Sequence, residues 1–208
     1  MNTKDRIKGW NNFFSRLDYP LSYSMKSIIK EYQHMINGNI IEIACGMHPL
    51  SDHIDITNKK RVLVDIINLE KKLEPMEDNP ILVCADLYLY NNFKEQNHPY
   101  NVALENIGGS YDSLIIGSGI NYFPWEDAFN VLLEDMNPSG LVFLHTGIFS
   151  NKDLRSPLLD SLIDDDKRPK SCDYIRNYFE KLHYDIIEDY RYYNLASIHH
   201  IDIVARKK

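Results

Sequence analysis

Apolar and polar residues follow two different patterns along the chain. In the first 37 residues, apolar and aromatic side chains recur every three or four positions, the spacing that places them on one face of a helix. A first helix is predicted to end at Asp18-Tyr19-Pro20, and a second at Asn37-Gly38. From Gly38 onward, short apolar runs alternate with helical segments, which predicts a parallel sheet covered by helices.

Seven of these apolar runs have the length and composition of strands. Helices are predicted over residues 125–136 and 174–182, and the connection over residues 50–60 has room for about two helical turns. The last two runs are long enough to form an antiparallel hairpin. The chain is therefore expected to fold as an α/β protein with strands at residues 40–43, 61–66, 80–87, 111–117, 141–145, 184–192 and 198–205.

The first predicted strand contains an acid and ends in a turn of small residues. Glu42 stands among isoleucines, and the small residues Ala44, Cys45 and Gly46 follow it before Pro49. A buried carboxylate without a partner is costly, so either a cation or hydrogen-bond donors must come to Glu42. The small residues allow the backbone of the turn to approach a ligand closely.

Two more predicted strands end in an acid. Asp65 follows Glu42 by 65 − 42 = 23 residues, close to the spacing between the turn and the ribose-binding acid of nucleotide-binding α/β domains. Asp86 ends the third strand. Each acid alone could be a helix N-cap, but the carboxyl ends of parallel strands meet at one rim, where open α/β sheets bind ligands.

The strand, its acid and its turn resemble motif I of the class I S-adenosylmethionine-dependent methyltransferases. The turn departs from the family's usual Gly-x-Gly-x-Gly, because Ala44 stands at the first glycine and Met47-His48-Pro49 follow Gly46. The resemblance implies a Rossmann-like fold: a mostly parallel seven-stranded sheet with helices on both faces and a C-terminal antiparallel hairpin. It also implies a helical lid at residues 1–37 and a cofactor-binding domain at residues 38–208.

The same resemblance assigns S-adenosylmethionine as the cofactor and places its binding residues. Asp65 would accept hydrogen bonds from the ribose, and Asp86 from the adenine amino group. The expected cofactor residues are Glu42, Ala44, Cys45, Gly46, Asp65, Ile66, Asp86, Leu87, Gly117 and Ser118.

Methyl transfer needs alignment of donor and acceptor and, for some acceptors, removal of a proton, but no metal. His145, at the end of the fifth strand, is the best candidate for a general base, with a structural, hydrogen-bonded role as the alternative. Tyr122 is the second candidate catalytic residue, and with Asn121 it could orient an acceptor. The expected substrate-binding residues are Trp10, Phe14, Tyr19, Tyr23 and Asn121, although packing against the sheet would also explain the aromatic ones.

Composition narrows the choice of acceptor. The 208 residues suit one domain, and the net charge of −7 disfavours loose attachment to nucleic acid. A small molecule methylated on oxygen or nitrogen is therefore expected, with RNA as the alternative because the Cys-Gly-x-x-Pro turn resembles that of some ribosomal RNA methyltransferases. A non-catalytic S-adenosylmethionine-binding module is a further alternative, whereas a nicotinamide dehydrogenase is disfavoured by Glu42, whose charge would oppose a pyrophosphate.

The remaining features favour an ordinary cytoplasmic protein. The three cysteines form no close pair, which argues against a zinc site and a disulfide framework. No apolar run is long enough for a membrane helix and no signal sequence is visible, so we expect a cytoplasmic monomer or homodimer with no membrane partner.

Overall fold

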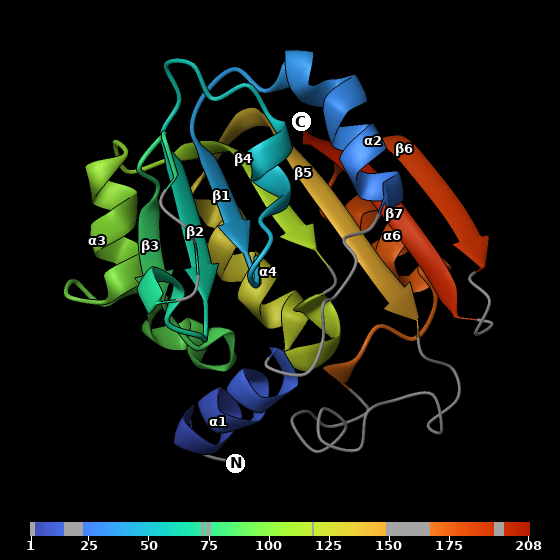
Figure 1. Ribbon diagram of the computed structural model, residues 1–208. Coiled ribbons are helices and arrows are strands. Elements are labelled where there is room, and N and C mark those ends of the chain that lie inside the picture. Colours follow the sequence, from blue (N-terminus) through green and yellow to red (C-terminus); the bar gives the residue numbers. More distant parts are fainter. Residues whose placement is uncertain are drawn as a thin grey trace.

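A seven-stranded sheet forms the centre of the computed structural model (Figure 1), which describes residues 3–14, 23–71, 73, 76–117, 119–148, 167–193 and 198–208. The strand order is β3-β2-β1-β4-β5-β7-β6. The first five strands in this order are parallel, and β7 runs antiparallel to both of its neighbours. The predicted fold class is thus confirmed, with strands β1 (Ile40–Ile43), β2 (Arg61–Asp65), β3 (Ile81–Cys84), β4 (Tyr111–Gly117), β5 (Met136–Ile148), β6 (Tyr184–Tyr193) and β7 (His199–Lys207).

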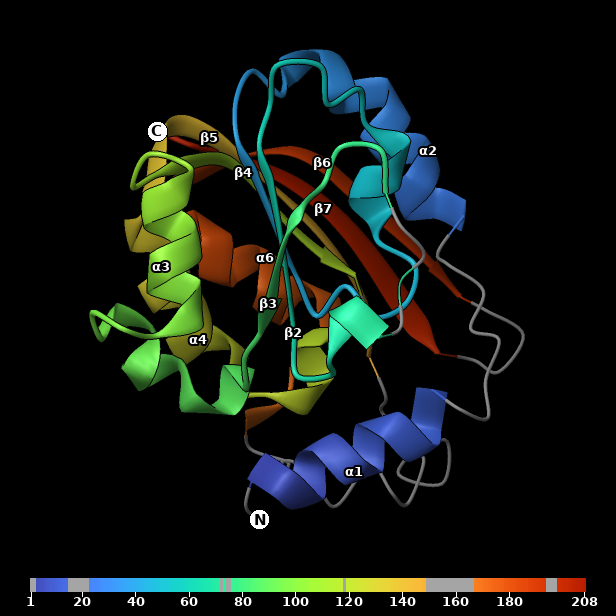
Figure 2. The ribbon, with the colours of Figure 1, turned by 60° about the vertical axis from the view of Figure 1, so that its left-hand side comes forward.

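Helices cover both faces of the sheet, and one helix lies at its rim (Figure 2). On one face, α3, α4 and α6 bury the larger core, which includes Trp125, Phe129 and Phe179. On the other face, α2 buries Met25 and Ile29 against the sheet. No helix among the described residues is long and apolar enough to span a membrane. The helices are α1 (Thr3–Phe14), α2 (Tyr23–Tyr32), α3 (Pro99–Asn106), α4 (Trp125–Glu134) and α6 (Cys172–Lys181).

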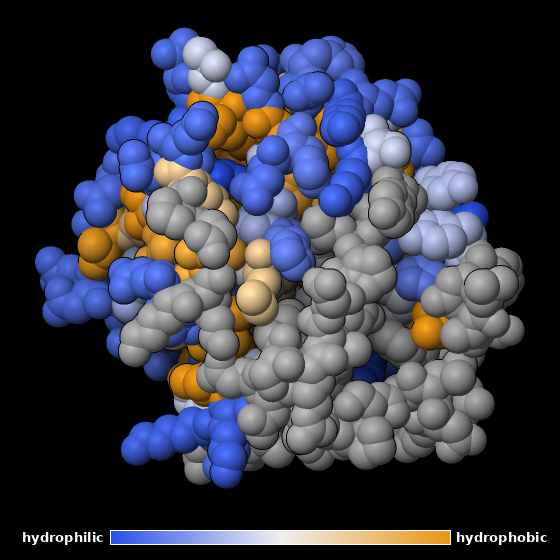
Figure 3. All heavy atoms as spheres, viewed as in Figure 1, coloured by the Kyte–Doolittle hydropathy of each residue, from blue (hydrophilic) through white to orange (hydrophobic). Residues whose placement is uncertain are grey.

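The α2 face has little helical cover over β2 and β3. The predicted two turns after β1 are a single 3-10 turn, η2 (Leu50–His53), and another short turn, η3 (Leu69–Lys71), follows β2. The buried Arg61 at the start of β2 fastens these connections, since its guanidinium binds Asp52, Asp78 and the hydroxyl of Ser51. Apolar residues accordingly reach the surface on the left side of Figure 3, over this part of the sheet.

Several predicted boundaries differ from those in the structure. Strand β3 stops at Cys84 rather than residue 87, because Asp86 leaves the sheet to cap the following 3-10 segment, η4 (Leu87–Lys94). Strand β5 begins at Met136 rather than residue 141, since residues 137–140, which separate the predicted helix from the predicted strand, continue the strand with Ser139 at a positive φ. Helix α3 was not predicted, although its N-cap His98 and the proline at N1 are recognisable start signals.

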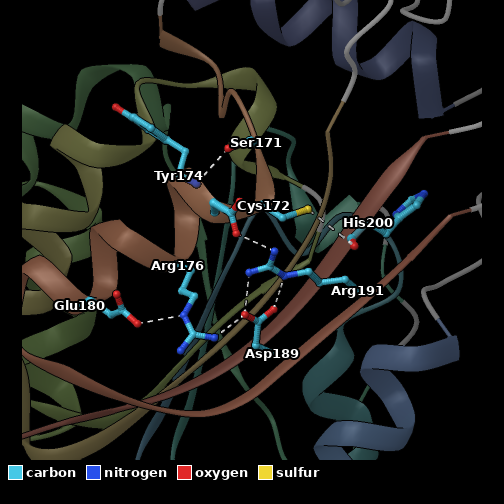
Figure 4. A network of polar contacts seen from close by, with 9 residues as sticks. Ser171, Cys172, Tyr174, Arg176, Glu180, Asp189, Arg191 and His200 are labelled. Carbon is cyan, nitrogen blue, oxygen red and sulfur yellow. Dashed lines mark hydrogen bonds and ion pairs between the residues drawn. The ribbon is translucent and has the colours of Figure 1, made fainter.

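The C-terminal hairpin is joined to α6 by a network of polar contacts (Figure 4). Asp189 of β6 accepts hydrogen bonds from Arg176 and Arg191, and Arg191 also binds Asp173. Because both arginines are partly exposed, these pairs contribute little to stability. The ring of His200 points away from this network, which places it on the opposite, α2 face of the sheet.

Candidate active site

The turn after β1 is held by the acid inside that strand. Glu42 is 1% exposed, and its two oxygens accept hydrogen bonds from the backbone N–H groups of Leu50 and Ser51, at 2.7 and 2.9 Å. The expectation that donors come to this carboxyl group is confirmed, and the donors belong to the turn itself. Burial raises the pKa of Glu42 to about 7, while these hydrogen bonds oppose the increase. Glu42 therefore fixes the far end of the turn.

Asp65 holds the near end of the same turn. Its carboxylate accepts hydrogen bonds from the backbone N–H of Gly46 at 2.9 Å and of Ile67 at 3.1 Å. The side chain is buried, and burial raises its pKa. Since β1 and β2 are parallel neighbours, both acids reach residues 44–51 from one rim of the sheet. The turn is thus shaped by two carboxylates from different strands.

The backbone at Ala44 has a conformation typical of glycine, although alanine stands there in place of the first glycine of motif I. Ala44 has φ 50° and Gly46 has φ 60°, both in the left-handed region that glycine adopts most easily. The methyl group of Ala44 fits because Gly119 lies opposite: a Cβ at residue 119 would lie 2.3 Å from the Cβ of Ala44. A glycine in the loop after β4 therefore compensates for the alanine in the turn.

Asp86, at the end of β3, binds the N-terminal helix. One oxygen caps η4 by accepting a hydrogen bond from the N–H of Tyr88. The other accepts hydrogen bonds from Nε of Arg6, at 2.9 Å, and from the hydroxyl of Thr3. The side chains of Arg6 and Asp86 are each 6% exposed, and the guanidinium of Arg6 lies 4.6 Å from the ring centre of Tyr88. Arg6 was not predicted as a site residue, although its three- to four-residue spacing from Thr3 and Trp10 places the three on one helix face.

A second contact of α1 lies in the loop after β4. The rings of Trp10 and Tyr122 meet edge to face with their centres 4.9 Å apart. Trp10 also packs against the cluster that contains Cys45 and Ile66. Figures 1 and 2 both show α1 across the carboxyl ends of the strands. The helix thus spans the rim from β3 to the loop after β4, above the turn.

Asn121 and His145 are both associated with strand β5. His145 belongs to the strand, and Asn121 is hydrogen-bonded to it. The amide of Asn121 is buried and donates hydrogen bonds to Thr146 Oγ1 and to the carbonyl of Gly147, both at 2.8 Å. His145 is 4% exposed, and its Nδ1 pairs with the fully buried carboxylate of Asp202. Asp202 was missed from the sequence, but an acid between Ile201 and Ile203 carries the same signal as Glu42 in β1.

Most of the predicted residues are thus gathered at one rim of the sheet. Ser118 and Tyr19 lie outside the described residues, and Phe14 and Tyr23 belong to α1 and α2 with side chains that are not described. Gly117 ends β4 beside the turn, since a Cβ there would lie 2.9 Å from Leu50 Cδ1. The rim carries Glu42, Ala44, Cys45, Gly46, Asp65, Ile66, Asp86 and Leu87, covered by α1 with Trp10, and their binding roles stay predictions.

Comparison with models of protein families finds no match. Comparison with the sequences of curated proteins also finds none. Solved structures, in contrast, are similar over nearly the whole chain. The 1,6-didemethyltoxoflavin-N1-methyltransferase of Burkholderia thailandensis, solved with its substrate and S-adenosylhomocysteine, superposes with a TM-score of 0.65 at 9% identity, covering 99% of this chain and 87% of that one.

Two further structures give the same result. An S-adenosylmethionine-dependent methyltransferase from Clostridium acetobutylicum has a TM-score of 0.58 at 14% identity, covering 99% of each chain. The N-methyltransferase NodS from Bradyrhizobium japonicum, solved with S-adenosylhomocysteine, has a TM-score of 0.57 at 8% identity, covering 91% of this chain and 89% of that one. The chain therefore has the fold of the class I S-adenosylmethionine-dependent methyltransferases, as its motif I resemblance predicted.

Proposed function

We propose that this protein is an S-adenosylmethionine-dependent methyltransferase that transfers a methyl group to oxygen or nitrogen of a small molecule. The observation that carries the proposal is the turn at residues 44–51, which Glu42 and Asp65 hold at the carboxyl rim of the sheet. Four similar structures were solved with S-adenosylhomocysteine, the product of such a transfer. The net charge of −7 supports a small-molecule acceptor over RNA.

The residues at the rim suit an adenosine-containing cofactor. The left-handed backbone at Ala44 and Gly46 brings the backbone close to the space above the turn, while the absence of a side chain at Gly117 makes room for Leu50 in the same turn. Asp65 would bind the ribose hydroxyls with lone pairs not used by Gly46 and Ile67. The cofactor would supply an electrophilic methyl group on a sulfonium. The protein's part is then to align the acceptor and exclude water.

Helix α1 is the proposed lid over this site. Two of its contacts, Arg6 with Asp86 and Trp10 with Tyr122, lie on either side of the turn. Trp10 would border the acceptor, and α2, which packs in the core, would serve as support. His145 would take a proton from the acceptor where one must be removed.

Calorimetric titration with S-adenosylmethionine tests the cofactor assignment. The unmodified protein should bind it, and Asp65→Ala should weaken binding at least about tenfold, since a hydrogen bond to a charged group contributes roughly 1.5–3 kcal/mol. Glu77→Ala, at an exposed acid in the connection after β2, is the matched control and should bind as the unmodified protein does. No binding by the unmodified protein, or equal affinity in Asp65→Ala, would refute the proposal.

Transfer of a labelled methyl group to the small-molecule fraction of a cell extract separates an enzyme from a binding module. Trp10→Ala should reduce the turnover strongly and leave the calorimetric affinity for S-adenosylmethionine almost unchanged, because Trp10 is assigned to the acceptor side. The opposite pattern, with weakened cofactor binding and normal turnover, would remove α1 from the acceptor site.

A further inference from the structure

Buried polar atoms without a hydrogen-bond partner gather beside His145. Among the residues that the structure describes, Oδ2 of Asp202 and both ring nitrogens of His200 have no partner. Asp202 lies directly opposite His145 in the sheet, and the ring of His200 stacks on that of His145 with 5.5 Å between centres. An unsatisfied buried polar group costs roughly 1–3 kcal/mol, so such a group in a native protein calls for an explanation.

The imidazole of His145 is fixed on two sides. Asp202 holds Nδ1, and His200 covers one ring face at an angle of 16° between the planes. Gly147 makes this stacking possible, because a Cβ there would lie 3.2 Å from Cε1 of His200. Tyr192 in turn stacks on His200 with 4.8 Å between the ring centres. This arrangement sets the orientation of the imidazole and leaves Nε2 as the nitrogen available for proton transfer.

His145 also lies close to the turn that is proposed to hold the cofactor. It is paired with Gly117 on the neighbouring strand, and paired strands lie about 4.8 Å apart. Gly117 in turn borders Leu50, whose backbone N–H is bound by Glu42. The side chains of Glu42, His145 and Asp202 project from the same face of the sheet, because their apolar neighbours along each strand pack on the opposite face. His145 therefore lies one strand away from the end of β4 and close to the turn that is proposed to hold the cofactor.

We infer that Asp202 is a positioning residue that makes His145 a general base toward a hydroxyl or N–H group of the acceptor; this rests on the proposed methyltransferase function. A carboxylate on Nδ1 favours the neutral tautomer with the proton on Nδ1 and a lone pair on Nε2. In the reaction, the acceptor proton moves to Nε2, and the lone pair left on oxygen or nitrogen bonds to the methyl carbon. The electron pair of the broken carbon–sulfur bond stays on sulfur, which gives S-adenosylhomocysteine.

The tautomer can be measured without any substrate. Long-range proton–nitrogen NMR spectra of the protein labelled with 15N-histidine, with His145→Gln for assignment, should show a neutral His145 protonated on Nδ1. Asp202→Asn should populate the other tautomer, whereas Asp189→Asn, on the opposite face of the hairpin, should leave the His145 signals unchanged. A His145 protonated on Nε2, or on both nitrogens at neutral pH, would overturn the inference.

The acceptor class can be tested with 4-nitrophenol, whose ionised form absorbs visible light. The protein is saturated with S-adenosylhomocysteine, and 4-nitrophenol is added at a pH below the pKa of the phenol. The phenol should become ionised when it binds. Asp202→Asn should reduce the ionised fraction at least about tenfold, and Asp189→Asn should not. Absence of the ionised phenol with the unmodified protein would overturn the acceptor class. Calorimetry with S-adenosylmethionine, done on the same samples, shows separately whether the cofactor assignment has failed.

Discussion

The turn after β1 and the helix α1 lie at the same rim of the sheet but are held there in different ways. The turn is bound through its own backbone, whose N–H groups donate to carboxylates of the two strands beneath it. Helix α1 is bound through side chains, by Arg6 and Thr3 to Asp86 and by Trp10 to Tyr122. The acids of the turn are within about 20 residues of their donors, whereas Arg6 and Asp86 are 80 residues apart.

The kind of contact decides which part of the rim can move. Releasing the turn would leave buried carboxylates and amides without partners, so the turn must stay closed for the domain to remain folded. Releasing α1 would expose Arg6 and Asp86 to water, which solvates both charges well. The turn is therefore a fixed part of the fold, and α1 is a separable cover over it.

The largest effect is expected at Glu42. Glu42→Ala should lower the free energy of unfolding by roughly 3 kcal/mol, because the N–H groups of Leu50 and Ser51 lose their acceptors inside the protein. Urea-induced unfolding measures this loss. Glu42→Gln keeps one acceptor oxygen and should lose less, and Glu77→Ala is the exposed control. If Glu42→Ala were as stable as the control, the turn would be no more fixed than α1.

The pH dependence of stability should follow the same residue. Glu42 has a pKa of about 7 in the folded protein and 4.5 as its ordinary value, so the folded state binds its proton more tightly than the unfolded state. The stabilising contribution of the protonated Glu42 to the free energy of unfolding is therefore complete below about pH 4.5 and is lost as the pH rises through 7. The free energy of unfolding, taken relative to Glu42→Gln, should fall by about 3 kcal/mol between pH 4 and pH 8. A rise over that range would contradict the assigned direction.

A smaller effect is expected where Ala44 meets Gly119. Gly119→Ala should lower stability by about 1–3 kcal/mol, since two Cβ atoms cannot lie 2.3 Å apart and the turn must shift. Adding Ala44→Gly removes one of the two methyl groups and should restore most of this loss. Unfolding of the two single variants and the double variant gives the coupling energy. Additive losses would show that the turn and the loop after β4 do not depend on each other.

The smallest change in global stability is expected at α1. Arg6→Ala should lower the free energy of unfolding by less than about 1 kcal/mol, because Asp86 becomes hydrated as the helix leaves. The amide hydrogens of α1 should nevertheless exchange at least about tenfold faster. Lys8→Ala removes an exposed cation from the same helix and serves as the control. Unchanged exchange in Arg6→Ala would show that the pair with Asp86 does not hold the helix.

The order of the elements and the fold could be predicted from the amino-acid sequence alone. Short apolar runs that alternate with helical segments leave few ways to bury their apolar faces, and a parallel sheet with an antiparallel hairpin satisfies them. The sequence also indicated that Glu42 must have partners, since no isolated carboxylate is stable in an apolar strand. The small residues that follow Glu42 predicted the turn, because they allow its backbone to approach a ligand closely.

The pairing of residues that are distant in the sequence follows from the three-dimensional packing and could not be predicted. Arg6 meets Asp86, Gly119 makes room for Ala44, and Asp202 pairs with His145 because packing brings separate elements together. The local geometry of the backbone sets which positions of one helix or strand share a face, so a periodic pattern in the sequence reveals these positions. Contacts across 57 to 80 residues depend on the summed packing of the whole core, which no local pattern records.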